Sequence, residues 1–232
     1  MISAGKVNLA KRMRNARYAV SHALRWGEEV TDAGGTYAEC FKMLSLCAWN
    51  SRISYARGTY NLCTGLTGSV PAWGSAITNA CGTYNLCTGL TGSVPAWGSA
   101  ITNAENTYGF CNGLTGSVPA WGSKITDASH TYNGCAGLTG SVPAWGSAII
   151  NANSTYNGCS GLTGDIPAWG AEITTANATY YKCKGLTGVW DSTASDAELM
   201  PSKITNKGNC VANCLPDLRQ YFLTTWGGTR AN

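Results

Sequence analysis

Apolar side chains recur along this chain with a period of about 24 residues, and the same apolar positions are filled in each copy of the unit. In one copy they are Ile77, Ala80, Tyr84, Cys87, Leu90, Val94 and Trp97. Spacings of three and four positions are typical of one face of a helix. A single continuous helix is nevertheless excluded, because Gly92, Pro95 and Gly98 interrupt the second half of the unit.

The unit is therefore divided into two predicted elements. The glycine-poor segment 77–86 is expected to form a short helix. The segment 90–94 is expected to form a short strand with Leu90 and Val94 facing inward, and Pro95 ends it. A repeat of this length is one coil of a solenoid rather than a domain. Equivalent strands of successive coils then stack about 4.8 Å apart as a parallel sheet.

The positions where the repeat begins and ends divide the chain into three segments. Residues 26–188 contain the recognisable units, and we expect a solenoid of about seven coils, each roughly 23–24 residues long. Residues 1–25 show a basic, amphipathic helical pattern, and residues 189–232 depart from the repeat. Both ends are predicted to be caps, because an end coil would otherwise expose its core. The other interpretation of residues 1–25 is a basic anchor for an acidic surface, nucleic acid or a membrane.

Composition narrows the classes of protein that fit this chain. The 232 residues are 44% hydrophobic and include nine tryptophans, which excludes wholesale disorder. Only 12% are charged, about half of the roughly 25% that is usual in soluble domains. The segment 1–25 carries six basic side chains and no acidic one, so the rest is nearly neutral and no nucleic-acid partner is expected. We expect neither a membrane span nor a signal peptide, because long apolar stretches are absent.

Each unit also contains a specific motif. Residues 125–128 are Ile-Thr-Asp-Ala, and residues 132–139 are Tyr-Asn-Gly-Cys-Ala-Gly-Leu-Thr. This arrangement resembles the BspA-type leucine-rich repeat, whose unit runs V-T-N-M-x-x-M-F-x-x-C-x-x-L-T-x-L, and the resemblance covers about residues 26–188. The chain departs from that family in its Pro-Ala-Trp-Gly segment and in its use of Thr-Tyr where the family has Met-Phe or Ala-Phe.

The resemblance agrees with an α/β fold, here a leucine-rich-repeat-like solenoid with a parallel sheet and terminal caps. It implies a surface-exposed, adhesive or partner-binding protein of bacteria or of some microbial eukaryotes. It implies no catalytic residues, and it does not identify a ligand.

Threonine and serine flank the glycine of each predicted strand. If the leucine and valine of the strand point inward, the two hydroxyl residues point outward, since successive side chains of a strand face opposite sides. The resulting ladder is a candidate binding face for a protein, a glycan or an ordered lattice such as ice. The alternative is that threonine simply suits a strand and that hydroxyl groups keep the face wet. The members of the ladder are Thr67, Ser69, Thr91, Ser93, Thr115, Ser117, Thr139, Ser141, Thr163 and Asp165.

Tryptophan and cysteine form two further columns. The tryptophans recur at one apolar phase of the unit, so we expect core packing; the alternative is a ladder on which sugars stack. The cysteines of the repeat lie one full unit apart, and no C-x-x-C pair exists to build a tetrahedral metal site. We expect buried free thiols that pack as small apolar groups. Cys81 stands in a varied polar column, which makes it the candidate for an exposed, reactive or intermolecular thiol.

These patterns predict a non-enzymatic, adhesin-like protein that recognises a protein or a glycan through the sheet face and varied surface columns. The varied positions are Glu105-Asn106, Gly109-Phe110, Lys124 and Ser129-His130. No catalytic, cofactor-binding or metal-binding residues are expected, because the sequence contains no nucleophile elbow, phosphate-binding loop or pair of metal-binding histidines. The expected location is the cell surface, the extracellular medium or a virion.

The alternative function is that of a viral or extracellular structural protein, such as a receptor-binding tail-fibre tip or a subunit of a self-assembling filament. Residues 58–104 contain no charged side chain, so self-repulsion between copies is weak there.

Overall fold

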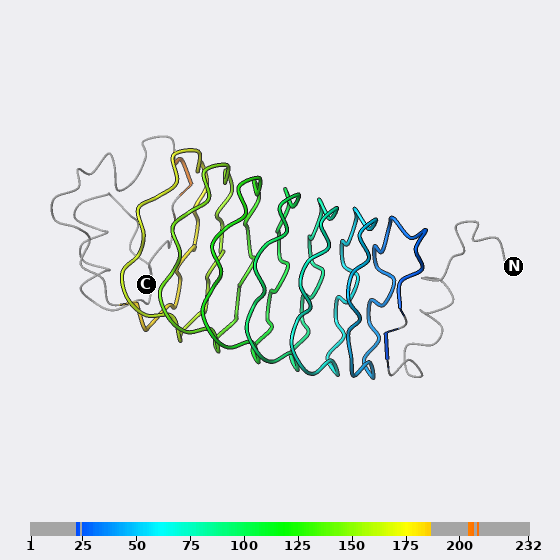
Figure 1. Cartoon of the computed structure of the whole chain (residues 1–232). Helices are drawn as coiled ribbons and strands as arrows, with labels where there is room; N and C mark the ends of the chain where they lie inside the picture. The colour runs from blue at the N-terminus through cyan, green and yellow to red at the C-terminus, as the bar shows by residue number, and fades with distance from the viewer. Residues whose placement is uncertain (1–21, 24, 187–203, 207, 209–232) are drawn as a thin grey trace, which may run out of the picture.

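The computed structural model describes residues 22–23, 25–186, 204–206 and 208. Within them the chain winds into a solenoid whose successive coils lie side by side along one axis (Figure 1). Seven equivalent tyrosines, one per coil, show the repetition: Tyr37, Tyr60, Tyr84, Tyr108, Tyr132, Tyr156 and Tyr180. The prediction of a solenoid of about seven coils is confirmed. The predicted caps, 1–25 and 189–232, lie largely outside the described residues.

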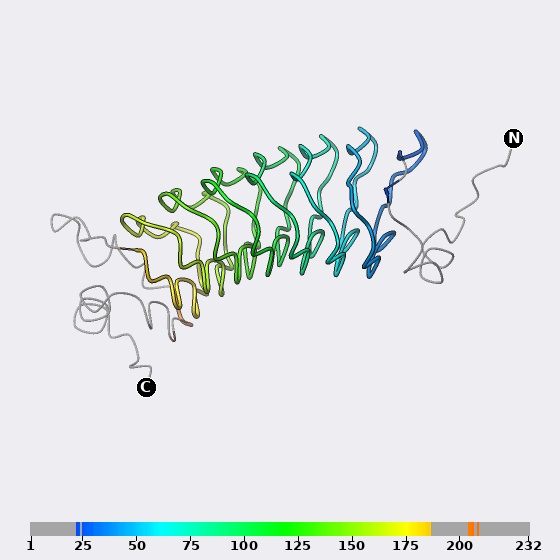
Figure 2. The same ribbon diagram turned by 90° about the horizontal axis from the view of Figure 1, so that it is seen from below.

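Adjacent coils are joined by isolated parallel β-bridges. One column of bridges links Asp32, Tyr55, Asn79, Asn103, Asp127, Asn151, Thr175 and Asn206 in that order. A second column begins with the bridge from Gly92 to Leu114 and repeats in the following coils as far as Leu186. Every bridge recorded between described residues is parallel, which confirms the predicted direction of pairing, but no continuous strand forms in this part of the chain. Seen from below, the coils follow one another in chain order (Figure 2).

The segment 77–86 is not helical, and the residues that the structure describes contain no helix. Alternate amides of this segment donate to carbonyls of the next coil: Ala80 N to Asn103 O and Tyr84 N to Thr107 O, at 2.9 Å each. Between them, Thr83 N and Asn85 N donate to carbonyls three positions back within their own coil, which produces a series of turns. The predicted helix was wrong, and with it the α/β class for the described part of the solenoid, because these turns generate the same spacing of apolar residues.

Left-handed backbone conformations explain why the segment turns instead of continuing as a helix. Gly82 has a φ of 60° and Leu86 a φ of 62°. The residues equivalent to Leu86 in the other coils also have positive φ: Glu39, Leu62, Phe110, Gly134, Gly158 and Lys182. Glycine adopts this conformation readily, whereas a bulky side chain is strained there. Two such residues per segment direct alternate amides toward the neighbouring coil.

One glycine in each coil allows neighbouring coils to approach closely. A β-carbon at Gly89 would collide with the carbonyl oxygen of Leu66 in the preceding coil. A β-carbon at each equivalent glycine would likewise collide with a backbone carbonyl oxygen of the preceding coil: Gly65, Gly113, Gly137, Gly161 and Gly185. The first glycine of each Gly-Leu-Thr-Gly motif is therefore required by packing between coils.

The interior consists of columns of identical or similar side chains. Five members of one coil are completely buried: Ile77, Ala80, Tyr84, Cys87 and Leu90. Their equivalents in the other coils join them in one continuous cluster. The tyrosine rings stack with centroids 5.4–5.7 Å apart and interplanar angles of 4–10°. Leu90 and Val94 both face inward, as predicted, because each coil completes its core with the side chains of its neighbours.

Candidate binding surface

The predicted ladder of hydroxyl residues lies on the outside of the solenoid, and all ten of its side chains are exposed. We term it the hydroxyl face: Thr67, Ser69, Thr91, Ser93, Thr115, Ser117, Thr139, Ser141, Thr163 and Asp165. A glycine with positive φ lies between the two members in each coil; for Gly92 the φ is 79°. The segment therefore bends at this glycine, while Leu90 and Val94 on either side stay buried.

Backbone hydrogen bonds between coils hold the hydroxyl face in register. Thr91 N donates to Gly68 O at 2.9 Å, and Thr115 N donates to Gly92 O at 2.8 Å. Equivalent bonds follow at Thr139 and Thr163 in the next two coils. The face thus presents the same groups once per coil along the axis.

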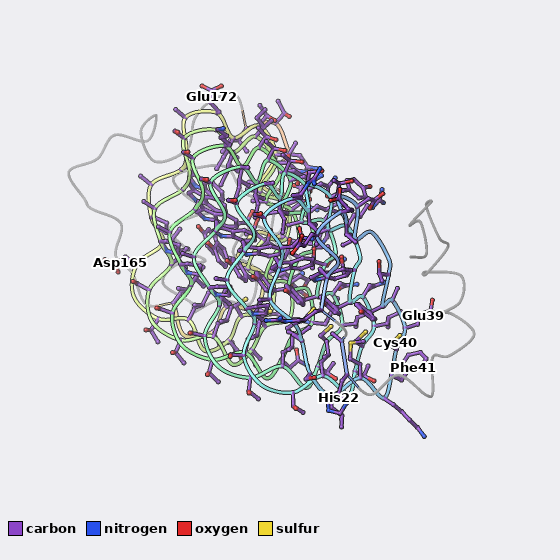
Figure 3. The ribbon with its side chains drawn as sticks, turned by 45° about the vertical axis from the view of Figure 1, so that its right-hand side comes forward. His22, Glu39, Cys40, Phe41, Asp165 and Glu172 are labelled. Carbon is purple, nitrogen blue, oxygen red and sulfur yellow. The ribbon has the colours of Figure 1, made fainter. Side chains whose placement is uncertain are left out.

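Most side chains of the hydroxyl face are available to an external partner. Thr67 Oγ1 donates to the carbonyl of Leu44 at 3.1 Å. The side chains of the other nine members make no hydrogen bond to the described residues. Asp165 is the charged member, and its side chain points outward at the edge of the solenoid (Figure 3). The face therefore consists of neutral donors and acceptors on four coils and adds a carboxylate on the fifth.

A second exposed threonine column was missed in the sequence, although its recurrence in successive units could have marked it. It includes Thr78, Thr102 and Thr126. Thr102 Oγ1 donates to Thr78 O and Thr126 Oγ1 donates to Thr102 O, both at 3.2 Å. Ile150, 47% exposed, takes the next place in the column. Because these hydroxyl protons are used between coils, the column is less suited to bind a partner.

The tryptophan column belongs to the core. From Trp49 to Trp169 the side chains are only 5–9% exposed. Successive indole rings stack with centroids 5.7–5.9 Å apart and interplanar angles of 6–11°. Both faces of an internal ring such as Trp97 are therefore covered by its neighbours. Core packing is confirmed, and the alternative of a sugar-stacking ladder is wrong.

The tyrosine hydroxyls face indole N–H groups inside the core. Burial raises the pKa of Tyr84 and Tyr108 well above 10, and the indole N–H groups of Trp49 and Trp73 partly oppose this rise. Neither Tyr84 Oη nor Trp49 Nε1 has a hydrogen bond of ordinary geometry to a described residue. These phenols therefore remain neutral at physiological pH.

The cysteines of the repeat column are buried thiols that form no disulfide, as predicted. From Cys63 to Cys183, each thiol of the column donates to the carbonyl oxygen of a tyrosine in the preceding coil; Cys87 Sγ donates to Tyr60 O and Cys111 Sγ to Tyr84 O, at 3.0 Å each. Burial raises the pKa of the Cys135 thiol to about 12. The thiols therefore stay protonated and serve as donors between coils, a role that the sequence pattern did not reveal.

Cys81 is not the exposed thiol that its polar column suggested. Its side chain is only 9% exposed, and its Sγ lies 3.4 Å from Oε2 of Glu105 in the next coil. Burial, followed by the charge of Glu105 and the hydrogen bond to it, raises the pKa of Cys81 to about 11. The prediction of exposure was wrong because the longer side chain of the following coil packs against the thiol.

A different cysteine has more contact with solvent. Cys47 stands where the following coils have proline, it is half-buried, and its Sγ lies 3.7 Å from the Tyr60 hydroxyl. Burial raises the pKa of Cys47 as well, so its thiol is also predominantly protonated at neutral pH.

The varied columns are only partly at the surface. Phe110 and Lys124 are exposed, whereas Gly109 and Ser129 are buried. Ser129 Oγ donates to Oδ1 of Asp127 at 2.6 Å, which satisfies the buried hydroxyl. For Gly109 and Ser129 the expectation that variation marks the surface was wrong, because the side chains of Asn85 and Asn106 cover Gly109 and Ser129 is bonded to Asp127.

A buried threonine before each repeat tyrosine was also missed. Thr107 Oγ1 lies 2.9 Å from Ala80 O and 2.8 Å from Ala104 O, and its side chain is completely buried. Equivalent hydrogen bonds are made by Thr59, Thr83, Thr131, Thr155 and Thr179. The constant Thr-Tyr pair in the sequence is the signal that could have revealed this cross-coil bond.

Within the described part of the chain, no cluster of three or more histidine, cysteine, aspartate or glutamate side chains is placed to hold a metal ion. The same residues include no helix that is long and apolar enough to span a membrane.

Comparison with known proteins identifies no family for this chain. No protein-family model matches it, and no curated protein is similar to it. One similar solved structure is the crystal structure of a leucine-rich cell surface protein from Faecalibacterium prausnitzii A2-165. The two chains are 13% identical over 66% of this chain and 68% of the other, with a TM-score of 0.23. A TM-score this low does not establish a common fold.

Proposed function

We propose that this chain is a non-enzymatic recognition protein that binds a protein or glycan surface through the hydroxyl face. The observation that carries the proposal is the exposed ladder of threonine and serine side chains, nine of whose ten members make no hydrogen bond to the described residues. Neutral hydroxyl groups both donate and accept hydrogen bonds, and they match the hydroxyl groups of sugars and the peptide groups of extended proteins.

Repetition strengthens this kind of binding. A single hydroxyl pair contributes a weak contact, but linked contacts on successive coils act at a high effective concentration toward a repetitive partner. The resemblance of the repeat motif to surface proteins supports a location at a cell surface, in the extracellular medium or on a virion. The protonated state of the buried thiols supports the absence of catalysis, because they supply no nucleophile at neutral pH.

The test screens the full chain against glycan and peptide arrays and then measures the affinity for the best ligand. A variant carrying Thr91→Val, Ser93→Ala, Thr115→Val and Ser117→Ala removes four exposed hydroxyl groups and keeps the side-chain volumes similar. We expect its dissociation constant to rise about tenfold or more, because the lost contacts act together.

The matched control changes exposed threonines of another column. Thr64→Val and Thr88→Val remove exposed hydroxyl groups from two adjacent coils, and this variant should bind like the wild type. Equal binding by all three proteins would contradict the proposal. Circular dichroism of each variant verifies that the solenoid is intact.

A structural role is the second candidate, and the absence of charged side chains over 58–104 favours it. An uncharged surface repels other copies weakly and is compatible with lateral assembly. Native mass spectrometry and electron microscopy of the full chain distinguish the two functions. Open-ended polymers support the structural role, whereas a species of fixed size that binds a ligand through the hydroxyl face contradicts it.

A further inference from the structure

Seven equivalent residues, one per coil, form a column that differs from the hydroxyl face in both backbone and chemistry. We term it the edge column: Glu39, Leu62, Leu86, Phe110, Gly134, Gly158 and Lys182. All seven have a φ between 60° and 76°. The column therefore begins with a carboxylate, continues with three large apolar side chains and two glycines, and ends with an ammonium group.

The three apolar members are not explained by the backbone of their own coils. Gly134 and Gly158 show that glycine fits this left-handed position, whereas Leu86 and Phe110 are strained in it. The Phe110 ring lies over Gly134 of the next coil, yet Phe110 is still 42% exposed, and Leu62 and Leu86 are partly exposed. Large apolar side chains that are kept at a strained, solvent-facing position indicate a contact outside the coil.

Backbone hydrogen bonds fix the spacing of the edge column. Leu86 N donates to Gly109 O at 2.7 Å, Phe110 N to Asn133 O at 2.6 Å, and the other members from Glu39 to Gly158 make equivalent bonds. Each amide thus bonds to the residue just before the next member of the column. The members therefore follow one another in a regular, rigid series.

The side chains of the edge column are self-complementary when two copies of the chain run antiparallel. With Phe110 on the two-fold axis, Leu86 of one copy faces Gly134 of the other and the phenylalanine ring that lies over it, and Leu62 faces Gly158. At the two ends, Glu39 of one copy faces Lys182 of the other. Large side chains then meet glycine positions, and opposite charges meet. A parallel arrangement would instead place leucine on leucine, glycine on glycine and like charges together.

We propose that the edge column is the isologous interface of an antiparallel homodimer of this chain. Six steps of about 4.8 Å make a strip about 29 Å long and one side chain wide, so the area that two copies bury along it is small. The expected dimer is therefore weak, with a dissociation constant of about micromolar order. This proposal does not depend on the hydroxyl face or on its ligand.

The first test measures the mass of the full chain by analytical ultracentrifugation over a concentration series. The wild type is expected to change from monomer to dimer as its concentration rises. Gly158→Leu fills the place of Leu62 from the second copy, and we expect the dissociation constant to rise about tenfold or more. The new side chain has space in the monomer, because a β-carbon at Gly158 has its nearest contact, Gly134 Cα, at an ordinary 3.5 Å; the strain of a leucine at a φ of 76° is shared by the control variant.

The matched control is Gly140→Leu. Gly140 also has a positive φ, 77°, and a β-carbon added there has its nearest contact, Ser117 Cβ, at 3.6 Å. It lies beside the hydroxyl face and should leave the dimer intact. A wild type that stays monomeric at every concentration, or a Gly158→Leu variant that dimerises like the control, would overturn the proposal.

The second test checks that the two copies run antiparallel. Glu39→Lys and Lys182→Glu should each weaken the dimer, because each places like charges together. Combining both substitutions in one chain should restore it, because opposite charges meet again. Failure of the double variant to recover affinity, or growth into open-ended polymers, overturns the antiparallel dimer.

Discussion

Two threonine columns of this molecule are equally regular in sequence but differ in structure. Thr107 and its equivalents are completely buried and bond to carbonyls of two coils. Thr115 and its equivalents are exposed, and the Thr115 hydroxyl makes no hydrogen bond to the described residues. Packing explains why the first column is constant and leaves the constancy of the second unexplained. Repetition therefore serves the core in the first column, whereas in the second it is accounted for by the proposed binding surface.

The largest expected effect comes from removing an aromatic ring of the interior. Trp121→Ala leaves a cavity between two stacked indole rings, so we expect the free energy of unfolding to fall by about 3–5 kcal/mol. Urea denaturation followed by circular dichroism measures this. Ser123→Ala, an exposed change in the same coil, is the control. Loss of glycan binding by Trp121→Ala without loss of stability would contradict the assignment of this column to the core.

Alkaline pH is expected to destabilise the interior through its thiols. The pKa of Cys63 and Cys135 is about 12 in the folded chain, against 9.0 for a solvated thiol. Because the folded-state pKa is raised, each thiol stabilises the fold fully below about pH 9. That contribution falls by about 1.4 kcal/mol per pH unit as the pH rises from about 9 toward 12.

Denaturation at a series of pH values checks this loss. Cys135→Ala removes one thiol, so its unfolding free energy should depend less steeply on pH above about 9. The same slope in the variant and in the wild type would show that the buried thiol does not control alkaline stability.

Removing one hydroxyl group from the buried threonine column is expected to lower the free energy of unfolding more than the small change in side-chain volume suggests. Thr107→Val keeps the shape of the side chain and removes the hydroxyl that bonds to Ala80 O and Ala104 O. The carbonyl acceptors lose a partner in a buried place, so we expect the free energy of unfolding to fall by about 1–3 kcal/mol. Chemical denaturation of the full chain measures the change.

The smallest effect on stability is expected at the hydroxyl face. Thr115→Val makes the same chemical change as Thr107→Val, but at an exposed position eight residues later in the same coil. We expect a change of less than about 0.5 kcal/mol in unfolding free energy. A loss as large as that of Thr107→Val would mean that the exposed column also serves packing, and the contrast between the two columns would disappear.

The repeat made the buried columns predictable and left the path of the backbone uncertain. Leu90, Val94 and Trp97 could be assigned to the core because their equivalents are apolar in successive coils. The turns at 77–86 could not be distinguished from a helix, because both place apolar residues three and four positions apart. Leu86 alone gives no sign of a left-handed backbone; only its equivalents Gly134 and Gly158 do.

The candidate sites were predictable only where exposure depends on a residue's own coil. Thr91 and Ser93 are exposed because the flanking apolar residues of their own coil point inward. Cys81 was misplaced because its exposure depends on Glu105, one coil later. Variation within a column was taken to indicate an exposed surface. A residue of such a column can nevertheless be covered by a side chain of the neighbouring coil, as Cys81 is by Glu105.

The hydrogen bonds between coils have a mechanical consequence. Bonds such as Ala80 N to Asn103 O and Tyr84 N to Thr107 O join one coil to the next along the axis. Force applied to the two ends of the solenoid therefore acts on the coils in series, as on the turns of a spring. Each coil that detaches releases about 80 Å of extended chain, while the remaining coils keep their shape. Under tension such a chain lengthens in steps and absorbs work at each one.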